Sequence, residues 1–287
     1  MKDIIISTES GSDLPQALIS RYGFQVIPMH VILNSESHPD GLLPVEKIYE
    51  YYETTGKVPT TSAVNTSEYQ EFFTRIRQEH PGCVIYHLAY SSTASSTYSN
   101  CSHAIRKFED IYLIDTKSVS GGCTAHLVNT WKLIQQQKDT VSDYGALAAQ
   151  IQALADRTVC HFIPGTLEYL KAGGRVSNAQ YLGATLLNLK PLIEIDPDGR
   201  LITTKKYRGS MARVARRFLS DFTEKYNLKR DCLYLMFSKG LDQSILDYMK
   251  EFAYASGFES CEYVMTGGVI SCHSGRGAIG LAGTLAD

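Results

Sequence analysis

The chain has 287 residues, of which 44% are hydrophobic and 20% are charged, and its formal net charge is −2. This balance is typical of a soluble globular protein, and the length favours two domains of about 150 residues each. The slightly acidic balance argues against a nucleic-acid partner, because proteins that bind phosphate backbones carry a basic excess.

Residues 1–7 (MKDIIIS) enter a short apolar run without a basic leader, and no segment contains 18 consecutive apolar residues. We therefore expect a cytoplasmic protein without a membrane-spanning helix. The seven cysteines are widely spread and include no C-x-x-C pair. This pattern predicts neither a disulfide framework nor a metal site.

Short β-branched runs alternate with stretches of helical period in the first half of the chain. The predicted strands cover 4–7, 84–90 and 111–115, and the predicted helices cover 44–53, 67–79, 96–108, 122–137 and 144–157. An α/β fold is expected, in which helices cover a mainly parallel sheet.

The order of predicted strands and helices changes near residue 158. Strands are predicted over 159–163, 232–237, 261–265 and 269–271, and helices over 166–172, 179–187, 210–228, 242–255 and 278–282. Residues 192–195 and 201–206 flank the turn Asp196-Pro197-Asp198-Gly199 and predict a hairpin. We expect a first α/β domain over 1–158 and a second over 159–287 with a mixed sheet, whose extreme C-terminal segment is free to pack back on the first domain.

Hydroxyl side chains fill the stretch Ser91–Thr97 except at Ala94. This stretch follows a predicted strand and opens a predicted helix. The carboxyl end of a parallel strand and the free N–H groups of the next helix together form an anion site, which suits a carboxylate or a phosphate. The alternative is that Ser95 only caps the helix.

A second pair of hydroxyl groups, on Thr61 and Ser62, precedes the predicted helix 67–79. Thr66 or Ser67 is enough to cap that helix, so the earlier pair is available as hydrogen-bond donors.

The segment His273-Ser274-Gly275-Arg276-Gly277 lies near the C-terminus. Its glycines allow the backbone to approach a ligand, and the imidazole is a donor for a carboxylate. The alternative for His273 is a structural, hydrogen-bonded histidine.

The paired glycines of Gly173-Gly174-Arg175 are typical of a helix C-terminus. Arg175 and Arg208 are thereby left as cations for a phosphate or an acidic partner, or as ordinary solvated charges.

Eight segments, in order along nearly the whole chain, resemble motifs of the DegV family of bacterial fatty-acid-binding proteins. They are Ser7-Thr8-Glu9-Ser10, Thr61-Ser62, Ser91-Ser92-x-x-Ser95-x-Thr97-Tyr98, Asp115-Thr116, Gly173-Gly174-Arg175-Val176, Leu186-Leu187-Asn188-Leu189-Lys190-Pro191, Lys206-Tyr207-Arg208 and His273-x-Gly275-x-Gly277. Each motif is short, but the ordered set is specific.

The resemblance implies two α/β domains that hold the carboxylate of a long-chain fatty acid at their interface and bury its tail in the second domain. The side chains expected to bind the carboxylate are those of Thr61, Ser62, Ser92, Ser95 and His273. The backbone of Gly275, Arg276 and Gly277 is expected beside the ligand.

The resemblance also implies a non-catalytic protein that presents its bound acid to a separate fatty acid kinase, which converts the acid to an acyl phosphate. Arg175 and Arg208 would then dock the kinase, and no cofactor other than the bound acid is expected. Transient contact with a membrane surface stays open. The alternatives are a small-molecule hydrolase or transferase that uses Ser92 and His273, although no G-x-S-x-G motif is present, and an interaction module without a ligand.

The sequence departs from the family pattern at several positions. Glu9 replaces an aspartate, Ser96 a glycine, Arg276 a small residue or proline, and Ala63-Val64 the common Gln-Pro. The change at Ser96 removes the freedom to adopt a positive φ, and Arg276 adds a cation beside the expected carboxylate.

Overall fold

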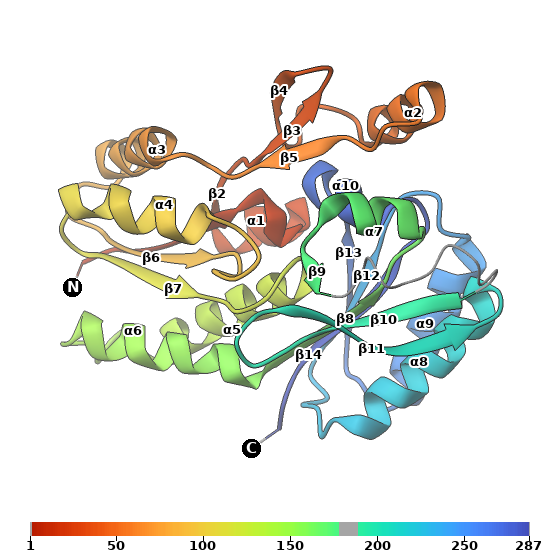
Figure 1. Ribbon diagram of the computed structural model, residues 1–287. Coiled ribbons are helices and arrows are strands. Elements are labelled where there is room, and N and C mark those ends of the chain that lie inside the picture. Colours follow the sequence, from red (N-terminus) through yellow and green to blue (C-terminus); the bar gives the residue numbers. More distant parts are fainter. Residues whose placement is uncertain (1, 178–188, 287) are drawn as a thin grey trace.

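The computed structural model describes residues 2–177 and 189–286, whose strands form three sheets (Figure 1). The first sheet has four parallel strands in the order β2-β1-β6-β7. Its strands are β1 (Ile4–Glu9), β2 (Gln25–Ile27), β6 (Val84–Ala89) and β7 (Ile111–Asp115). All six residues of β6 are buried, as expected for a central strand with helices on both faces. The predicted parallel sheet is confirmed.

Helices cover both faces of this sheet. On one face lie α3 (Thr66–Glu79) and α4 (Thr97–Ala104), and on the other α5 (Gly121–Gln137) and α6 (Tyr144–Ala153) (Figure 1). The predicted helices 96–108 and 144–157 each end in a 3₁₀ turn, Ile105–Lys107 and Leu154–Arg157. Asn65 caps α3 by accepting a hydrogen bond from the amide of Glu68, whose side chain accepts in return from the amide of Asn65.

The second sheet has seven strands in the order β13-β12-β14-β8-β10-β11-β9. The strands are β8 (Thr158–Ile163), β9 (Val176–Ser177), β10 (Leu189–Ile195), β11 (Leu201–Arg208), β12 (Leu233–Phe237), β13 (Cys261–Met265) and β14 (Ile279–Thr284). β14 pairs antiparallel with β8 and β12, whereas β13 pairs parallel with β12. β10 and β11 form the predicted hairpin. The predicted mixed sheet is therefore confirmed.

One helix of the first half of the chain also covers the second sheet. α5 contacts β8, β12 and β14, whereas α8 (Met211–Lys225) and α9 (Gln243–Ala255) pack on β12, β13 and β14 around a separate apolar cluster. An apolar cluster joins α5 to this sheet and consists of Leu18, Ala125, Val128, Cys160, Tyr234, Met236, Val264 and Ala282. Burial of this cluster holds the two halves of the chain together.

A third, antiparallel sheet was not predicted. It has the order β4-β3-β5 and comprises β3 (His30–Leu33), β4 (Glu36–Pro39) and β5 (Thr60–Ser62). The remaining elements are α1 (Gln16–Tyr22), α2 (Val45–Thr55), α7 (Leu167–Gly173), α10 (Gly268–Ser274) and the 3₁₀ turn Ser10–Ser12. α10 packs against β3, β5, α2 and α7, so a C-terminal helix completes a layer built from the first half of the chain.

Two predictions near the C-terminus were wrong. Residues 269–271, predicted as a strand, belong to α10, and of residues 278–282, predicted as a helix, all but Ala278 belong to β14. A short apolar run suits a buried strand as well as a buried helix, so periodicity alone does not separate them. The predicted helix 179–187 lies outside the described residues. No helix within 2–177 and 189–286 has the length and apolar composition that crossing a bilayer requires.

Candidate functional site

A cavity of about 300 Å³ lies between β5, the turn after β6, α7, α10 and the second sheet. Its wall is mostly apolar and includes Phe162, Leu170, Val176, Leu201, Ile270 and Ile279. The volume falls at the lower end of the range of small-molecule sites, which is about 300–1,000 Å³. A predominantly apolar wall favours a ligand with a large hydrocarbon part.

Polar groups from two distant segments meet on this wall. Thr61 Oγ1 on β5 lies 3.0 Å from His273 Nε2 in the last turn of α10, and both residues line the cavity. Ser62 and Ser95 line it as well. The structure therefore brings together four of the five side chains that were expected to bind a carboxylate.

The imidazole of His273 is held by a close contact with a glycine. A Cβ atom on Gly173, at the end of α7, would lie 2.2 Å from His273 Nδ1. Among the described residues, the buried Nδ1 has no hydrogen-bond partner. Burial, followed by the positive charge of Arg175, lowers the pKa of His273 to about 4. The ring is therefore neutral at pH 7, with one nitrogen atom as donor and the other as acceptor.

The serines of the stretch Ser91–Thr97, called the hydroxyl turn below, lie in different surroundings. Ser95 and Ser96 line the cavity, and Ser95 Oγ accepts hydrogen bonds from the amide and the hydroxyl of Thr97, at 3.2 and 2.7 Å. Ser95 thus supplies a side-chain acceptor for the first amide of α4, as a helix-capping residue does. Ser92 is exposed, is not part of the cavity wall, and donates its amide to Asp115 Oδ1 at 3.2 Å. Ser96 has φ −74°, so this turn does not need the glycine that the family pattern suggested.

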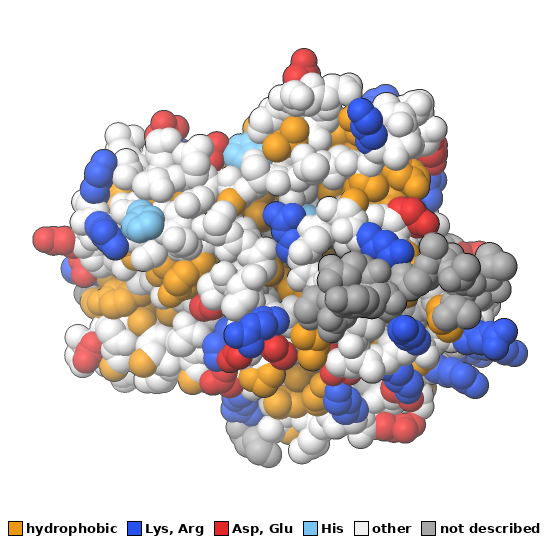
Figure 2. All heavy atoms as spheres, in the orientation of Figure 1, with side chains coloured by type: hydrophobic (Ala, Val, Ile, Leu, Met, Phe, Trp, Pro, Cys, Tyr) orange, Lys and Arg blue, Asp and Glu red, His pale blue; other side chains and the backbone are white. Residues whose placement is uncertain are grey.

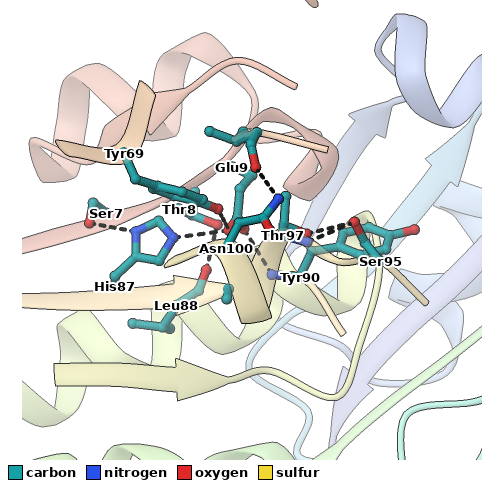
Figure 3. Close-up of polar contacts among 12 residues, drawn as sticks. Ser7, Thr8, Glu9, Tyr69, His87, Leu88, Tyr90, Ser95, Thr97 and Asn100 are labelled. Carbon is teal, nitrogen blue, oxygen red and sulfur yellow. Dashed lines mark hydrogen bonds and ion pairs between the residues drawn. The ribbon is translucent and has the colours of Figure 1, made fainter. Parts of the chain in front are cut away.

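A fully buried ionic cluster lies beneath this turn (Figure 3). Glu9 Oε1 accepts hydrogen bonds from His87 Nε2 at 3.0 Å and from the hydroxyl of Tyr69, while Oε2 accepts from the amide of Tyr90 at 2.8 Å. Burial alone raises the pKa of Glu9, but the charge of His87 and these hydrogen bonds outweigh it and hold the pKa below its ordinary value. The cluster thereby fixes Tyr90, which lines the cavity.

Two carboxylates hold the start of α10. Asp13 Oδ1 accepts from the amide of Gly267, and Asp40 Oδ1 accepts from the amide of Gly268, both at 2.8 Å. Burial raises the pKa of Asp13 well above its ordinary value, although hydrogen bonds from Ser120 and Gly267 oppose the shift. Sequence reasoning missed Asp13 and Asp40 and named Glu9 only as part of a family motif, because a lone acidic residue carries no local signal of a partner far along the chain.

The predicted docking and ligand-adjacent residues have different surroundings. Arg175 is exposed, lines the cavity and donates to the carbonyl of Gly173 at 2.7 Å. Arg276 is not part of the cavity wall; its guanidinium lies 3.3 Å from Glu53 and over the ring of Tyr49.

The neighbours of Arg276 in the chain, Gly275 and Gly277, have φ of 71° and 75° and also lie outside the cavity wall. Arg208 is exposed at the end of β11, where Lys and Arg side chains gather over β11 and the start of α8 (Figure 2). The added cation at position 276 is thus directed at α2 rather than at the cavity.

The pair required by the hydrolase alternative is not hydrogen-bonded. His273 Nε2 contacts Thr61, and the carboxylate of Asp115 accepts from the amides of Ser92 and Lys117. Nowhere in the described part of the chain do three or more His, Cys, Asp or Glu side chains gather as metal ligands.

Residues 3–284 match the model of a family described as uncharacterised proteins of the DegV family. The chain belongs to the DegV family. A DegV domain-containing protein of Clostridium acetobutylicum is 24% identical over an alignment of 288 positions, which covers 98% of each chain. Another, from Halalkalibacterium halodurans, is 28% identical over an alignment of 290 positions, which again covers 98% of each chain.

Solved structures of DegV proteins share the fold. A DegV family protein from Thermus thermophilus, described by its fatty acid binding, has a TM-score of 0.85 at 26% identity, over 99% of this chain and 100% of its own. A fatty acid binding DegV family protein from Streptococcus agalactiae has a TM-score of 0.84 at 20% identity, over the whole of both chains, and shows the fold alone. The two-domain α/β architecture implied by the resemblance is confirmed.

Proposed function

We propose that this DegV protein binds a long-chain fatty acid, with the tail in the apolar cavity and the carboxylate at Thr61, Ser62, Ser95 and His273. One observation carries the proposal: an apolar cavity whose wall holds a cluster of neutral hydroxyl groups and a neutral imidazole. Fatty acid binding by the DegV protein from Thermus thermophilus, 26% identical, supports it.

The energetics favour a carrier. Burial of each CH₂ group contributes about 0.8 kcal/mol, so a tail of about 16 carbons gains on the order of 10 kcal/mol before the costs of association. The polar groups therefore need only to orient the carboxylate. Neutral donors suffice for that, and the hydrogen-bonded Thr61 and His273 both lie on the cavity wall.

Extraction tests this proposal directly. Purified protein is extracted with organic solvent, the extract is analysed by mass spectrometry, and the delipidated protein is titrated with palmitate. We expect a co-purifying fatty acid and saturable binding at one site per chain. Absence of both results would exclude the carrier function.

We further propose that the protein is non-catalytic and presents its bound acid to a fatty acid kinase, docking through Arg175 and Arg208. Both arginines are exposed, and Arg175 lies at the wall of the cavity. Arg175→Ala and Arg208→Ala should each slow acyl-phosphate formation by a DegV-partner kinase at least tenfold when the rates are compared at saturating palmitate. Arg208→Ala should leave palmitate affinity unchanged, because Arg208 lies outside the cavity wall. Arg106→Ala, an exposed cation on the 3₁₀ turn after α4, is the control. Unchanged kinase rates for both variants would exclude the docking role.

A further inference from the structure

One methionine forms part of the cavity wall and is confined on two sides by glycines. Met236 on β12 is 4% exposed and lines the cavity together with Gly280, its partner across the β12–β14 pair. A Cβ atom on Gly280 would lie 2.5 Å from Met236 Cε. The methionine thus occupies space that any side chain at position 280 would fill.

The other side of Met236 faces the start of α5. A Cβ atom on Gly121 would lie 2.5 Å from Met236 Cγ and 2.7 Å from its Sδ, and the amide of Gly121 points at that sulfur at 3.1 Å. Gly121 at the start of α5 and Gly280 on β14 thus bound the side chain on two sides, and Met236 also forms part of the cavity wall.

We propose that Met236 sets the longest acyl chain that this protein accepts. This inference rests on the proposed fatty acid binding and names the residue that limits it. An unbranched thioether with three rotatable bonds fills irregular gaps in apolar walls. Here the two glycines fix where it lies, so the depth of the cavity at this point depends on one side chain.

Removal of the side chain tests the proposal. Met236→Ala deletes three heavy atoms beyond Cβ, room for about two to three methylene groups, and each newly buried CH₂ strengthens binding about fourfold. The saturated acid that binds best to the wild type is determined first, by competition among acids of 12 to 20 carbons. In Met236→Ala, the affinity for an acid two carbons longer, relative to that best acid, should then rise at least about tenfold.

Addition of one methyl group at the neighbouring glycine gives the opposite test. Gly121→Ala presses on Met236, and the next contact of the new Cβ is an ordinary one with Val264 at 3.8 Å. We expect the preference to move toward acids about two carbons shorter. Met236→Leu conserves volume and is the matched control, with an unchanged preference.

The outcomes are distinct. Shifts in opposite directions for Met236→Ala and Gly121→Ala support the assignment. An unchanged preference in both variants, each folded by circular dichroism and able to bind palmitate, overturns it and leaves fatty acid binding intact. If Met236→Ala does not fold, Gly121→Ala alone decides. Failure of the wild type to bind any acid removes the proposed function itself.

Discussion

The hydrogen bond between Thr61 and His273 joins residues 212 positions apart and sets the polar end of the cavity. Partial burial of His273 and the nearby positive charge of Arg175 favour the neutral form of the imidazole, and a neutral imidazole accepts or donates as the ligand requires. The other ring nitrogen, Nδ1, packs against Gly173 and has no partner in the described part of the chain, so Nε2 and the Thr61 hydroxyl group are the polar atoms of this pair that a ligand can meet. At this scale the chemistry depends on single hydroxyl groups, which conservative substitutions remove cleanly.

Thr61→Val tests the hydroxyl group of β5. Valine keeps the shape of threonine but leaves the carboxylate with one donor fewer, so palmitate affinity should fall about tenfold. Isothermal titration calorimetry measures it. Thr60→Val is the matched control, because Thr60 is the exposed neighbour on the same strand and does not line the cavity. Equal affinities for the two variants would contradict the assignment of Thr61.

The two serines of the hydroxyl turn are distinguished in the same way. Ser95→Ala should weaken palmitate binding about tenfold, because Ser95 lines the cavity. Ser92→Ala should change it less than twofold, since its side chain is exposed and lies outside the cavity wall. The reverse order of effects would show that the bound state rearranges the turn.

At the scale of elements, α10 carries the imidazole and its start is fastened to the first half of the chain. The amides of Gly268 and Val269 point at Asp40 Oδ1, at 2.8 and 3.3 Å, and Ser10 donates to the other oxygen at 2.7 Å. The first turn of a helix leaves its N–H groups without partners. A carboxylate there accepts hydrogen bonds from them, and its negative charge interacts favourably with the positive end of the helix dipole. A short helix held in this way positions His273.

Asp40→Ala should therefore affect binding as well as stability. Loss of the acceptor leaves two helix amides without a partner, which lowers the free energy of unfolding by about 2 kcal/mol. It should also displace His273 and thereby lower palmitate affinity. Asp242→Ala is the control, since Asp242 caps α9 through the amide of Ser244. It should cost about 1 kcal/mol without any change in affinity. Urea unfolding and calorimetry give the two quantities.

At the scale of the whole molecule, α5 connects the two main sheets, because it packs between the first and the second. Its His126 is fully buried; Nε2 donates to the carbonyl of Ile151 at 2.8 Å, and Nδ1 has no partner among the described residues. Burial lowers the pKa of His126 to about 4, against the opposing effects of Ile151 and Asp115. Because its ordinary pKa is 6.5, the unfolded chain takes up this proton first as the pH falls.

Stability should therefore fall between about pH 6.5 and pH 4. The part of the unfolding free energy that depends on neutral His126 is fully present above the pKa of the unfolded chain and is lost as the pH falls toward the folded pKa. The loss is about 2 kcal/mol at pH 5. His126→Gln retains a donor for Ile151 without this titration. Its loss of unfolding free energy from pH 7 to pH 5, measured with urea, should be smaller than that of the wild type by about 2 kcal/mol. The raised pKa of Asp13 acts in the opposite direction in both proteins and cancels in the comparison. Equal losses would contradict the prediction.

Local patterns in the sequence were sufficient for much of the fold. Alternating strands and helices predicted the parallel sheet, and the Asp196–Gly199 turn predicted the hairpin, because hydrogen bonds within helices and tight turns depend on residues close in the chain. The motifs around Thr61, Ser95 and His273 were found in the same way. Hydroxyl and imidazole side chains are hydrogen-bond donors whatever their position in the fold, so residue type alone identified them as candidates.

The tertiary structure alone decided how these segments meet. β3 and β5 are short strands on which the distant helix α10 packs, and β14 is a strand because β8 and β12 flank it. The same holds for the site: burial of the Asp13 and Glu9 carboxylates, the exposure of Ser92, and the confinement of Met236 by Gly121 and Gly280 follow from contacts between distant segments. Periodicity and composition describe one segment at a time, whereas packing depends on which surfaces exclude water together.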